Sequence, residues 1–375
     1  MNLITAQGPH SISYLARNSS DNTLILQDDN HLDLIEVSNP FQQFDGGEDI
    51  APYDVLVFTR PNWPEAQIWT LKEGGENVGH VFSLEALASS QSSLLNNKYT
   101  KVAGAIVLQR LCLGRTYNEI TLRLCKLNER YGIDDIYPEN CVVGVISRKR
   151  IVALGSVVND WNQFVLDRLP VFSENGLHLL SEVAGRKTYD SASTEKLPAY
   201  TRNLQLSGVN GHLPGAARRF LQEVLLKEVP FQEHPAFRYF LCYQLIEVLI
   251  DDLHTRVLQV FLIDSAGKNS QELRALLKKL QERIREKDRV MRLIHANASG
   301  QVYNDLRSAC NSVLLSLGRP EEGDTAEAIY ALRNMLFHDF NAAACATVSL
   351  KAASDLFFQV ACQLALNYTI PSDTL

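Results

Sequence analysis

The sequence predicts an α+β protein in which an N-terminal mixed α/β region is followed by an all-α helical bundle. Short apolar runs separated by Asp/Asn, Gly and Pro clusters fill the N-terminal part, a pattern typical of small sheets. A helical period of apolar residues begins beyond Gly215 and continues almost to the C-terminus. At 375 residues the chain exceeds the usual size of one core. We therefore expect a small β-rich region at 1–100, a mixed region at 101–212 and a bundle at 213–375.

Composition and charge limit the kinds of partner. Hydrophobic residues make up 46% and charged residues 21% of the chain, an ordinary globular composition. The net charge of -7 argues against a protein that coats nucleic acid over its whole surface, so any basic face must be local. The N-terminus lacks the pattern of a signal peptide, and no apolar segment approaches the ~20 residues that span a bilayer. We expect a cytoplasmic protein without membrane contact.

The seven cysteines are scattered along the chain and lie mostly in apolar runs. This is typical of reduced core residues in a cytosolic protein. No cysteine pair shows the close Cys/Cys or Cys/His spacing of a zinc site. We therefore expect no metal and no other cofactor.

The first elements are predicted as short strands of a small sheet. Turn-forming clusters such as Gly46-Gly47 separate these runs. The predicted strands are Thr23 to Gln27, Leu32 to Val37, Asp54 to Arg60, Gln67 to Lys72 and Val78 to Phe82.

The next segment resembles a helix-turn-helix unit. Lys101 to Cys112 is strongly apolar, and Thr116 with Glu119 forms a capping box for a second helix. A third helix over Val142 to Leu154 would carry the basic residues Arg148, Lys149 and Arg150 toward nucleic acid. The alternative is a strand over Cys141 to Ile146, which is rich in β-branched residues, with the basic cluster as a solvated end. From Ser173 to Gly215 we expect irregular structure.

Six helices are predicted beyond the boundary. Pro230 ends the first, Pro235 begins the second, and Gly267 breaks the chain before the third. The third has an apolar face and a heavily charged face. The predicted helices are Ala216 to Glu228, Phe237 to Ile263, Ser270 to Ile294, Val302 to Leu317, Thr325 to His338 and Asn341 to Asn367. Long helices with short connections form a bundle.

The run from Asp324 to Asp339 contains the candidate site. Asp324 and Glu327 form the start of a capping box, which specifies the beginning of the helix. Arg333 and His338 lie about a turn and a half apart near its C-terminal end, and Asn334 shares a face with His338. The pattern therefore predicts three clustered polar groups.

At these residues the sequence resembles the HEPN superfamily (higher eukaryote and prokaryote nucleotide-binding domains). Arg333-Asn334 and His338 match its motif of Arg, four to six residues and His, with Asn directly after the Arg. Tyr243 and Glu247 lie in a segment similar to the family's first core helix. The resemblance covers about Pro235 to Asn367. Arg289 and His295 also satisfy the bare spacing, but Val290 follows the Arg, so we interpret this second match as coincidental.

The resemblance implies a metal-independent endoribonuclease. An imidazole with an ordinary pKa near ~6.5 suits proton transfer, so His338 is the candidate acid or base. Arg333 is suited to hold the charge of the phosphate in the transition state, and Asn334 to position phosphate or imidazole. The family also implies RNA as the partner, a homodimer through the C-terminal bundle, and a role as a toxin or phage-defence effector, here with an N-terminal sensing or regulatory region and a regulatory partner protein.

Other interpretations of the same residues remain open. A histidine or arginine in the last turn of a helix often only offsets the helix dipole or caps carbonyls. There are two alternative functions. The chain could be a nucleic-acid-binding regulator that binds through the helix-turn-helix segment, or a non-catalytic HEPN adaptor. The charged helix after Ser270 supplies three further candidate RNA-binding residues, Lys278, Lys279 and Arg283, although such a face is often merely solvated.

Overall fold

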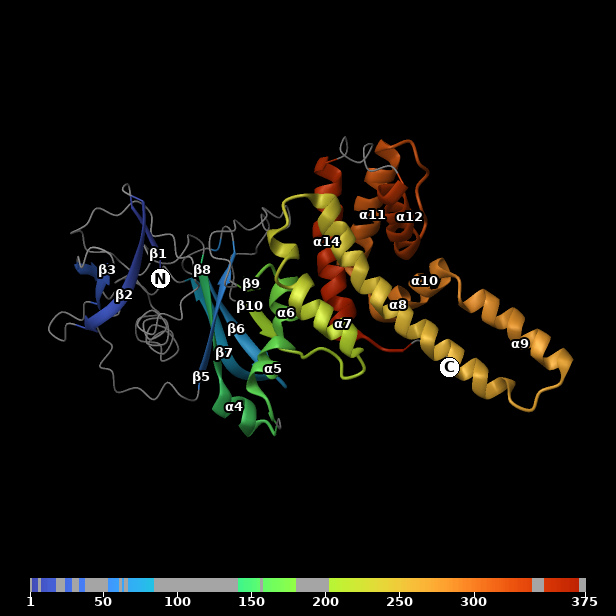
Figure 1. The fold of residues 1–375 in the computed structure, drawn as a ribbon, viewed down its shortest axis with the longest axis horizontal. Helices are drawn as coiled ribbons and strands as arrows, with labels where there is room; N and C mark the ends of the chain where they lie inside the picture. Colours follow the sequence, from blue (N-terminus) through green and yellow to red (C-terminus); the bar gives the residue numbers. More distant parts are fainter. Residues whose placement is uncertain are drawn as a thin grey trace. The chain divides into compact units, whose positions relative to one another are not determined.

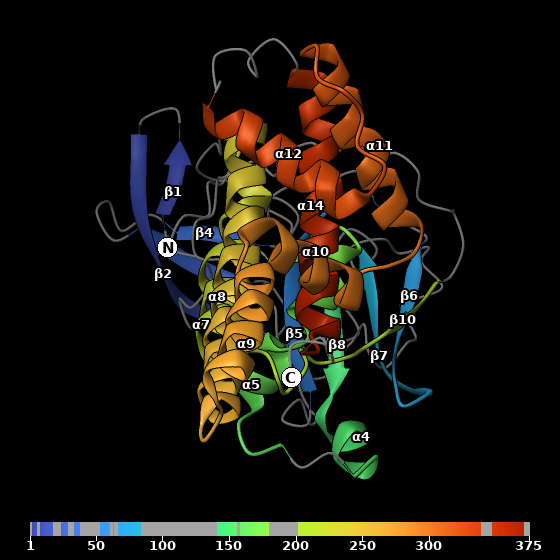
Figure 2. The same ribbon diagram turned by 90° about the vertical axis from the view of Figure 1, so that its right-hand side faces the viewer.

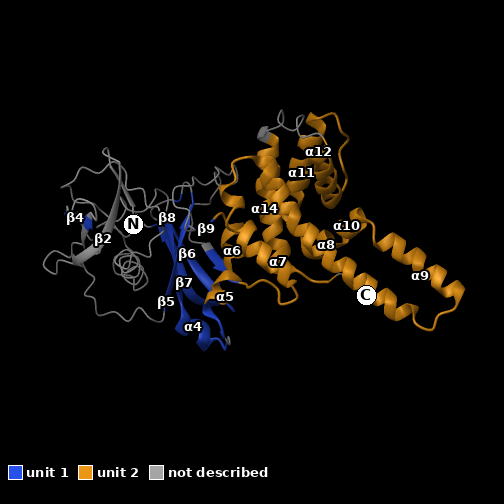
Figure 3. Ribbon diagram, viewed as in Figure 1, with its two compact units in different colours: residues 1–161, 177–188, 197–206 blue, residues 162–176, 189–196, 207–375 orange. Residues whose placement is uncertain are grey.

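The computed structural model has an α+β fold with two compact units (Figure 1, Figure 3). It describes residues 2–5, 8–17, 24–28, 34–37, 53–60, 63, 67–83, 141–155, 158–179, 202–338 and 347–370. The first unit comprises residues 1–161, 177–188 and 197–206, and the second comprises 162–176, 189–196 and 207–375. The helical unit thus includes a segment, 162–176, that lies before the boundary expected at residue 213. No helix in the described ranges is long and apolar enough to cross a membrane.

The described residues of the first unit form two sheets. The four-stranded sheet has the order β1-β2-β3-β4 and antiparallel pairing, over Asn2–Thr5, Gly8–Arg17, Leu24–Asp28 and Leu34–Val37. The six-stranded sheet has the order β10-β6-β7-β8-β5-β9. Its strands are β5 (Tyr53–Thr59), β6 (Ile68–Glu73), β7 (Glu76–Ser83), β8 (Cys141–Ser147), β9 (His178–Leu179) and β10 (Arg202–Gln205). The five predicted strands are confirmed with small shifts, but they divide between two sheets instead of forming one. The segment 173–215, expected to be irregular, supplies β9 and β10, and β10 pairs with β6 in parallel.

Of the two alternatives for this segment, the strand over Cys141 to Ile146 is confirmed and the third helix from Val142 is wrong. Its first half is the strand β8, which pairs with both β5 and β7 and buries Val142, Val143, Val145 and Ile146. Four β-branched residues in such a run favour a strand with both faces covered. Only α4 (Arg148–Ala153) is helical, and the Ser147 hydroxyl caps it. The first two helices of the proposed helix-turn-helix unit lie outside the described residues.

The centre of the six-stranded sheet is closely packed. Trp69, Phe58 and Phe82 are fully buried. Gly79 on β7 lies so close to β8 that a Cβ atom at that position would stand 2.0 Å from the carbonyl oxygen of Val145. A side chain there would force these two strands apart.

The second unit is built from helices. The predicted ranges for Phe237 to Ile263, Val302 to Leu317 and Thr325 to His338 are confirmed to within a few residues. The helices are α5 (Trp161–Leu166), α6 (Leu169–Glu174), α7 (Gly215–Phe220), α8 (Pro235–Ser265), α9 (Ser270–Arg283), α10 (Glu286–Asn297), α11 (Gln301–Ser316), α12 (Thr325–His338) and α14 (Thr347–Asn367). Figure 2 shows α11, α12 and α14 grouped at one end of α8, with α9 beside the other end.

Two predicted helices are interrupted. The first, from Ala216, continues after α7 as a π-helical turn at Leu221–Leu225 and a 3-10 turn at Val229–Phe231. The helix predicted over Ser270 to Ile294 is divided, because Arg285, the residue before α10, has an extended backbone. No Gly or Pro marks this break, so it depends on packing: α9 buries no residue, whereas α10 buries Val290, Leu293 and Ile294.

Long-range contacts tie α8 to α14 and to α12, the helix that carries the candidate site residues. Arg238 on α8 forms a 2.5 Å ion pair with Asp355 on α14, and both side chains are 3% exposed. The Tyr239 hydroxyl donates to the Ile329 carbonyl on α12 over 3.0 Å. Because buried polar groups are costly unless paired, these contacts specify how the three helices pack.

Candidate groove at the end of α12

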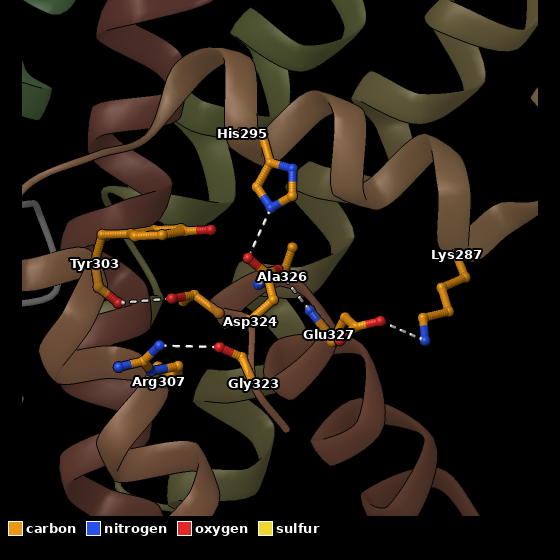
Figure 4. Close-up of polar contacts among 9 residues, drawn as sticks. Lys287, His295, Tyr303, Arg307, Gly323, Asp324, Ala326 and Glu327 are labelled. Carbon is orange, nitrogen blue, oxygen red and sulfur yellow. Dashed lines mark hydrogen bonds and ion pairs between the residues drawn. The ribbon is translucent and has the colours of Figure 1, made fainter. Parts of the chain in front are cut away.

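The N-terminus of α12 is firmly held (Figure 4). Asp324 accepts hydrogen bonds from the backbone N–H groups of Ala326 (2.8 Å) and Glu327 (3.3 Å), as an N-cap residue does. Its other carboxylate oxygen contacts Nε2 of His295 over 2.9 Å. The Glu327 carboxylate, predicted to complete a capping box, contacts Lys287 on α10 over 2.9 Å. The start of α12 is thus joined to α10.

The loop between α11 and α12 is fixed by an asparagine. The Asn311 amide donates to the Glu322 carbonyl (2.9 Å) and accepts from the Glu322 N–H (3.0 Å), replacing a backbone partner. Arg307 also donates to the Gly323 carbonyl over 2.9 Å (Figure 4). Gly318 ends α11 with a positive φ of 70°, and the Arg319 N–H returns to the Leu314 carbonyl. The path of this loop is therefore well specified.

An open groove lies between this loop and the C-terminal half of α12. Its volume is about 360 Å³. The groove combines an apolar floor with a few polar groups, as small-molecule and nucleotide sites often do. The lining residues are Leu314, Arg319, Pro320, Glu322, Ala331, Asn334, Met335 and His338. Two of the three predicted site residues, Asn334 and His338, thus share one groove, one helical turn apart.

Arg333 is directed to other elements. One terminal nitrogen donates to the Glu247 carboxylate of α8 (2.8 Å) and lies 3.8 Å from the Glu286 carboxylate of α10. The other nitrogen donates to Oδ1 of Asn334 over 2.9 Å. The guanidinium lies 5.0 Å from the ring centre of Tyr243 and 5.6 Å from that of Phe337. These contacts hold Arg333 and set the orientation of the neighbouring amide.

The electrostatics around Arg333 favour its charge. Burial opposes the charge, but the hydrogen bond with Glu247 and the nearby Tyr243 and Glu286 outweigh it and raise the pKa of the guanidinium. Burial also raises the pKa of the Tyr243 hydroxyl, and Glu286, to which that hydroxyl donates, adds to the shift. Tyr243 therefore acts at neutral pH as a hydrogen-bond donor.

His338 is exposed at the last turn of α12. Its ring stands edge to face with that of Phe337, with the two ring centres 5.5 Å apart. Phe337 is 68% exposed, whereas the apolar residues Met335, Phe357 and Phe358 are buried within the chain. An exposed imidazole thus lies beside an exposed aromatic ring.

The other candidate RNA-binding residues lie on two separate helices. Lys278 and Lys279 are exposed on α9, and Arg283 is half-buried at its end. On α4, Arg148 pairs with Asp54 over 2.6 Å and lies over the Trp161 ring, while Arg150 donates to the Asn77 carbonyl. Lys149 is exposed. Arg148 and Arg150 therefore fasten α4 within the first unit.

The second Arg/His spacing has a structural role. Arg289 donates to the Ile250 carbonyl of α8 over 3.1 Å. His295 holds the N-cap residue Asp324. Neither residue lines the groove.

The two charged groove residues other than His338 were not identified from the sequence. Arg319 and Glu322 reach the groove from a loop, and their distance from His338 depends on how α11 and α12 pack. The signal available was the Gly318-Arg319-Pro320 turn between two predicted helices, which places a cation at a helix end.

Comparison with family models, curated proteins and solved structures gives no match to this chain. Among the described residues, no group of three or more His, Cys, Asp or Glu side chains is arranged to hold a metal ion.

Proposed function

We propose that the helical unit is a metal-independent endoribonuclease of the HEPN type, with its site in the groove at the end of α12. The observation that carries the proposal is the pairing of His338 with Asn334 in one open groove, beside an Arg333 that orients the amide. Imidazole is the side chain best suited to proton transfer near neutral pH. The exposed ring of Phe337 provides a surface on which an unpaired base can stack.

In this reaction the RNA itself supplies both the nucleophile and the leaving group. The ribose 2′-oxygen attacks the adjacent phosphorus, the bond from phosphorus to the 5′-oxygen breaks, and the products are a 2′,3′-cyclic phosphate and a 5′-hydroxyl. One proton leaves the 2′-hydroxyl and one is gained by the 5′-oxygen. His338 serves one of these transfers and solvent water the other, and hydrogen-bond donors in the groove stabilise the charge that gathers on the phosphate.

The resemblance also supports a dimer and a biological role. We propose a homodimer through the bundle; Met335, Phe357 and Phe358 are buried within the chain and do not contribute to its interface. We further propose that the first unit senses a trigger or restrains a nuclease used as a toxin or against phage, in a cytoplasmic setting.

The test is cleavage of total and transfer RNA by purified protein, with and without chelator. We expect wild-type cleavage to survive chelator and leave cyclic phosphate ends, and His338→Ala to lose at least ~10²-fold. His212→Ala is the matched control, because His212 is exposed in the same unit but does not line the groove. Full activity in His338→Ala, or activity that requires a divalent ion, would contradict the mechanism.

A second candidate function is RNA or nucleotide binding without cleavage. This function is favoured because the Arg333 guanidinium is already paired with Glu247 and flanked by Glu286, so it is not free to stabilise a transition state. Binding of labelled RNA that is equal in wild type and His338→Ala, with no product from either, would support it.

A further inference from the structure

The charge balance around Arg333 is unfavourable for a phosphate. Its single positive charge lies 2.8 Å from the Glu247 carboxylate and 3.8 Å from that of Glu286. At neutral pH these three side chains sum to one negative charge. A phosphate approaching the guanidinium would have to displace a short ion pair and would face a second carboxylate.

Arg319 is the arginine that lines the groove itself. It is exposed, it lines the groove with Asn334 and His338, and it stands on the loop that Asn311 clamps. Glu322 also lines the groove, so one carboxylate shares the groove with Arg319, compared with the two that lie near the Arg333 guanidinium.

The contact from Arg333 to Asn334 determines what the amide offers to the groove. A guanidinium only donates hydrogen bonds, so the atom that it contacts must be the amide oxygen. The amide nitrogen, with two N–H groups, is then the end that Asn334 presents to a ligand. Without Arg333 the amide would be free to turn over and present its oxygen, which repels phosphate.

We propose that Arg319 binds the scissile phosphate and that Arg333 is a positioning residue that acts through Asn334. This assignment rests on the proposed ribonuclease function. The groove then brings three donors to one phosphate: the Arg319 guanidinium, the Asn334 amide nitrogen and a ring N–H of His338. It differs from the sequence-based expectation, in which Arg333 holds the charge of the transition state.

The first part of the test measures binding without turnover. In the full-length His338→Ala protein, the affinity for a fluorescein-labelled single-stranded RNA is compared before and after adding Arg319→Ala. Loss of a charge-assisted contact should weaken binding ~10-fold or more and reduce the slope of log affinity against log salt by about one. Arg219→Ala is the matched control, because Arg219 is an exposed arginine on α7. Arg319→Lys should recover part of the loss.

The second part measures cleavage in the presence of His338. Arg333→Ala and Asn334→Ala should each lower kcat, and the double variant should lose no more than the larger single loss, because both changes remove one oriented amide. Thermal midpoints are recorded for every variant.

The outcomes distinguish the inference from the function on which it rests. If wild type cleaves RNA but Arg319→Ala binds and cleaves like Arg219→Ala, the assignment of Arg319 is wrong. If Arg333→Ala causes a further large loss in the Asn334→Ala protein, Arg333 contacts the phosphate itself. If wild type neither binds nor cleaves RNA, the ribonuclease proposal fails and the assignment fails with it.

Discussion

Arg333 and Glu247 form an ion pair between α12 and α8, with 2.8 Å between the guanidinium nitrogen and the carboxylate oxygen. The two residues are 86 positions apart in the chain, so the pair records how the two helices pack. Its side chains are 21% and 43% exposed, which limits its contribution to stability to about 0–1 kcal/mol. A pair this exposed orients the Arg333 side chain but contributes little to the stability of the fold.

Glu247→Ala is therefore expected to reduce cleavage more than stability. Without its carboxylate, Arg333 and the Asn334 amide lose a fixed orientation, and misplacement of this kind should lower kcat about ten-fold. The change is checked by kinetics together with thermal unfolding. Glu223→Ala is the control, since it removes an exposed ion pair with Lys227 that is distant in sequence from the groove residues. Equal kcat values in the two variants would contradict the positioning role.

Substitutions of the second Arg/His pair, Arg289 and His295, should lower stability without lowering cleavage activity. His295→Ala removes the contact with Asp324 and should lower the thermal midpoint slightly, by the ~0.2–1 kcal/mol typical of an exposed pair, while cleavage per folded molecule stays near that of wild type. Arg289→Ala should likewise act on stability through the Ile250 carbonyl. A ~10²-fold loss of cleavage in either variant would mean that the active pair has been misassigned.

Local signals explain which helices were predicted correctly. The bounds of α12 follow from the Asp324 cap and the period of its apolar residues. The bounds of α8 follow from Pro235, which begins the helix, and from Gly267, which comes just after its end. The break between α9 and α10 has no such signal. The break arises because α10 packs against the rest of the unit and α9 does not bury any residue, and the period of apolar residues in the sequence carries no information about such packing.

The site was predictable only along α12. Asn334 and His338 share a face by helical geometry, so their common groove follows from their spacing. The direction of Arg333 and the approach of Arg319 depend on contacts between distant segments. The parallel pairing of β10 with β6 was missed for the same reason, because register across a long connection has no local signature.

Stability should depend on pH through Asp324. Burial alone would raise the pKa of this carboxyl, but the hydrogen bond with His295 and those from the backbone N–H groups of Glu327 and Ala326 lower it from 3.8. A carboxyl whose pKa is lower in the folded state than in the unfolded state stabilises the protein at pH values above its unfolded-state pKa. This contribution is lost as the pH falls through its folded-state pKa.

Urea unfolding at several pH values below about 5 tests this. Asp324→Asn keeps an N-cap acceptor but does not titrate, so its disadvantage relative to wild type should shrink as the pH falls. His295→Ala should also reduce the pH dependence, because the lowering of the pKa derives in part from His295. A difference between wild type and Asp324→Asn that stays constant from about pH 6 to about pH 3 would contradict the argument.

The basic face of α9 should affect RNA affinity and leave catalysis unchanged. Lys278 and Lys279 are exposed on a helix whose apolar residues Leu273, Leu276 and Leu280 are half-covered. Replacing both lysines with alanine should weaken binding for all RNA sequences alike and lower the salt slope by up to about two, since each phosphate contact adds about one, while kcat at saturating RNA is kept. The double variant Arg219→Ala/Lys227→Ala removes two cations elsewhere in the unit, the exposed Arg219 and the half-buried Lys227, and should bind like wild type. If both double variants lose affinity equally, the loss reflects net charge alone, and α9 has no particular role in guiding RNA.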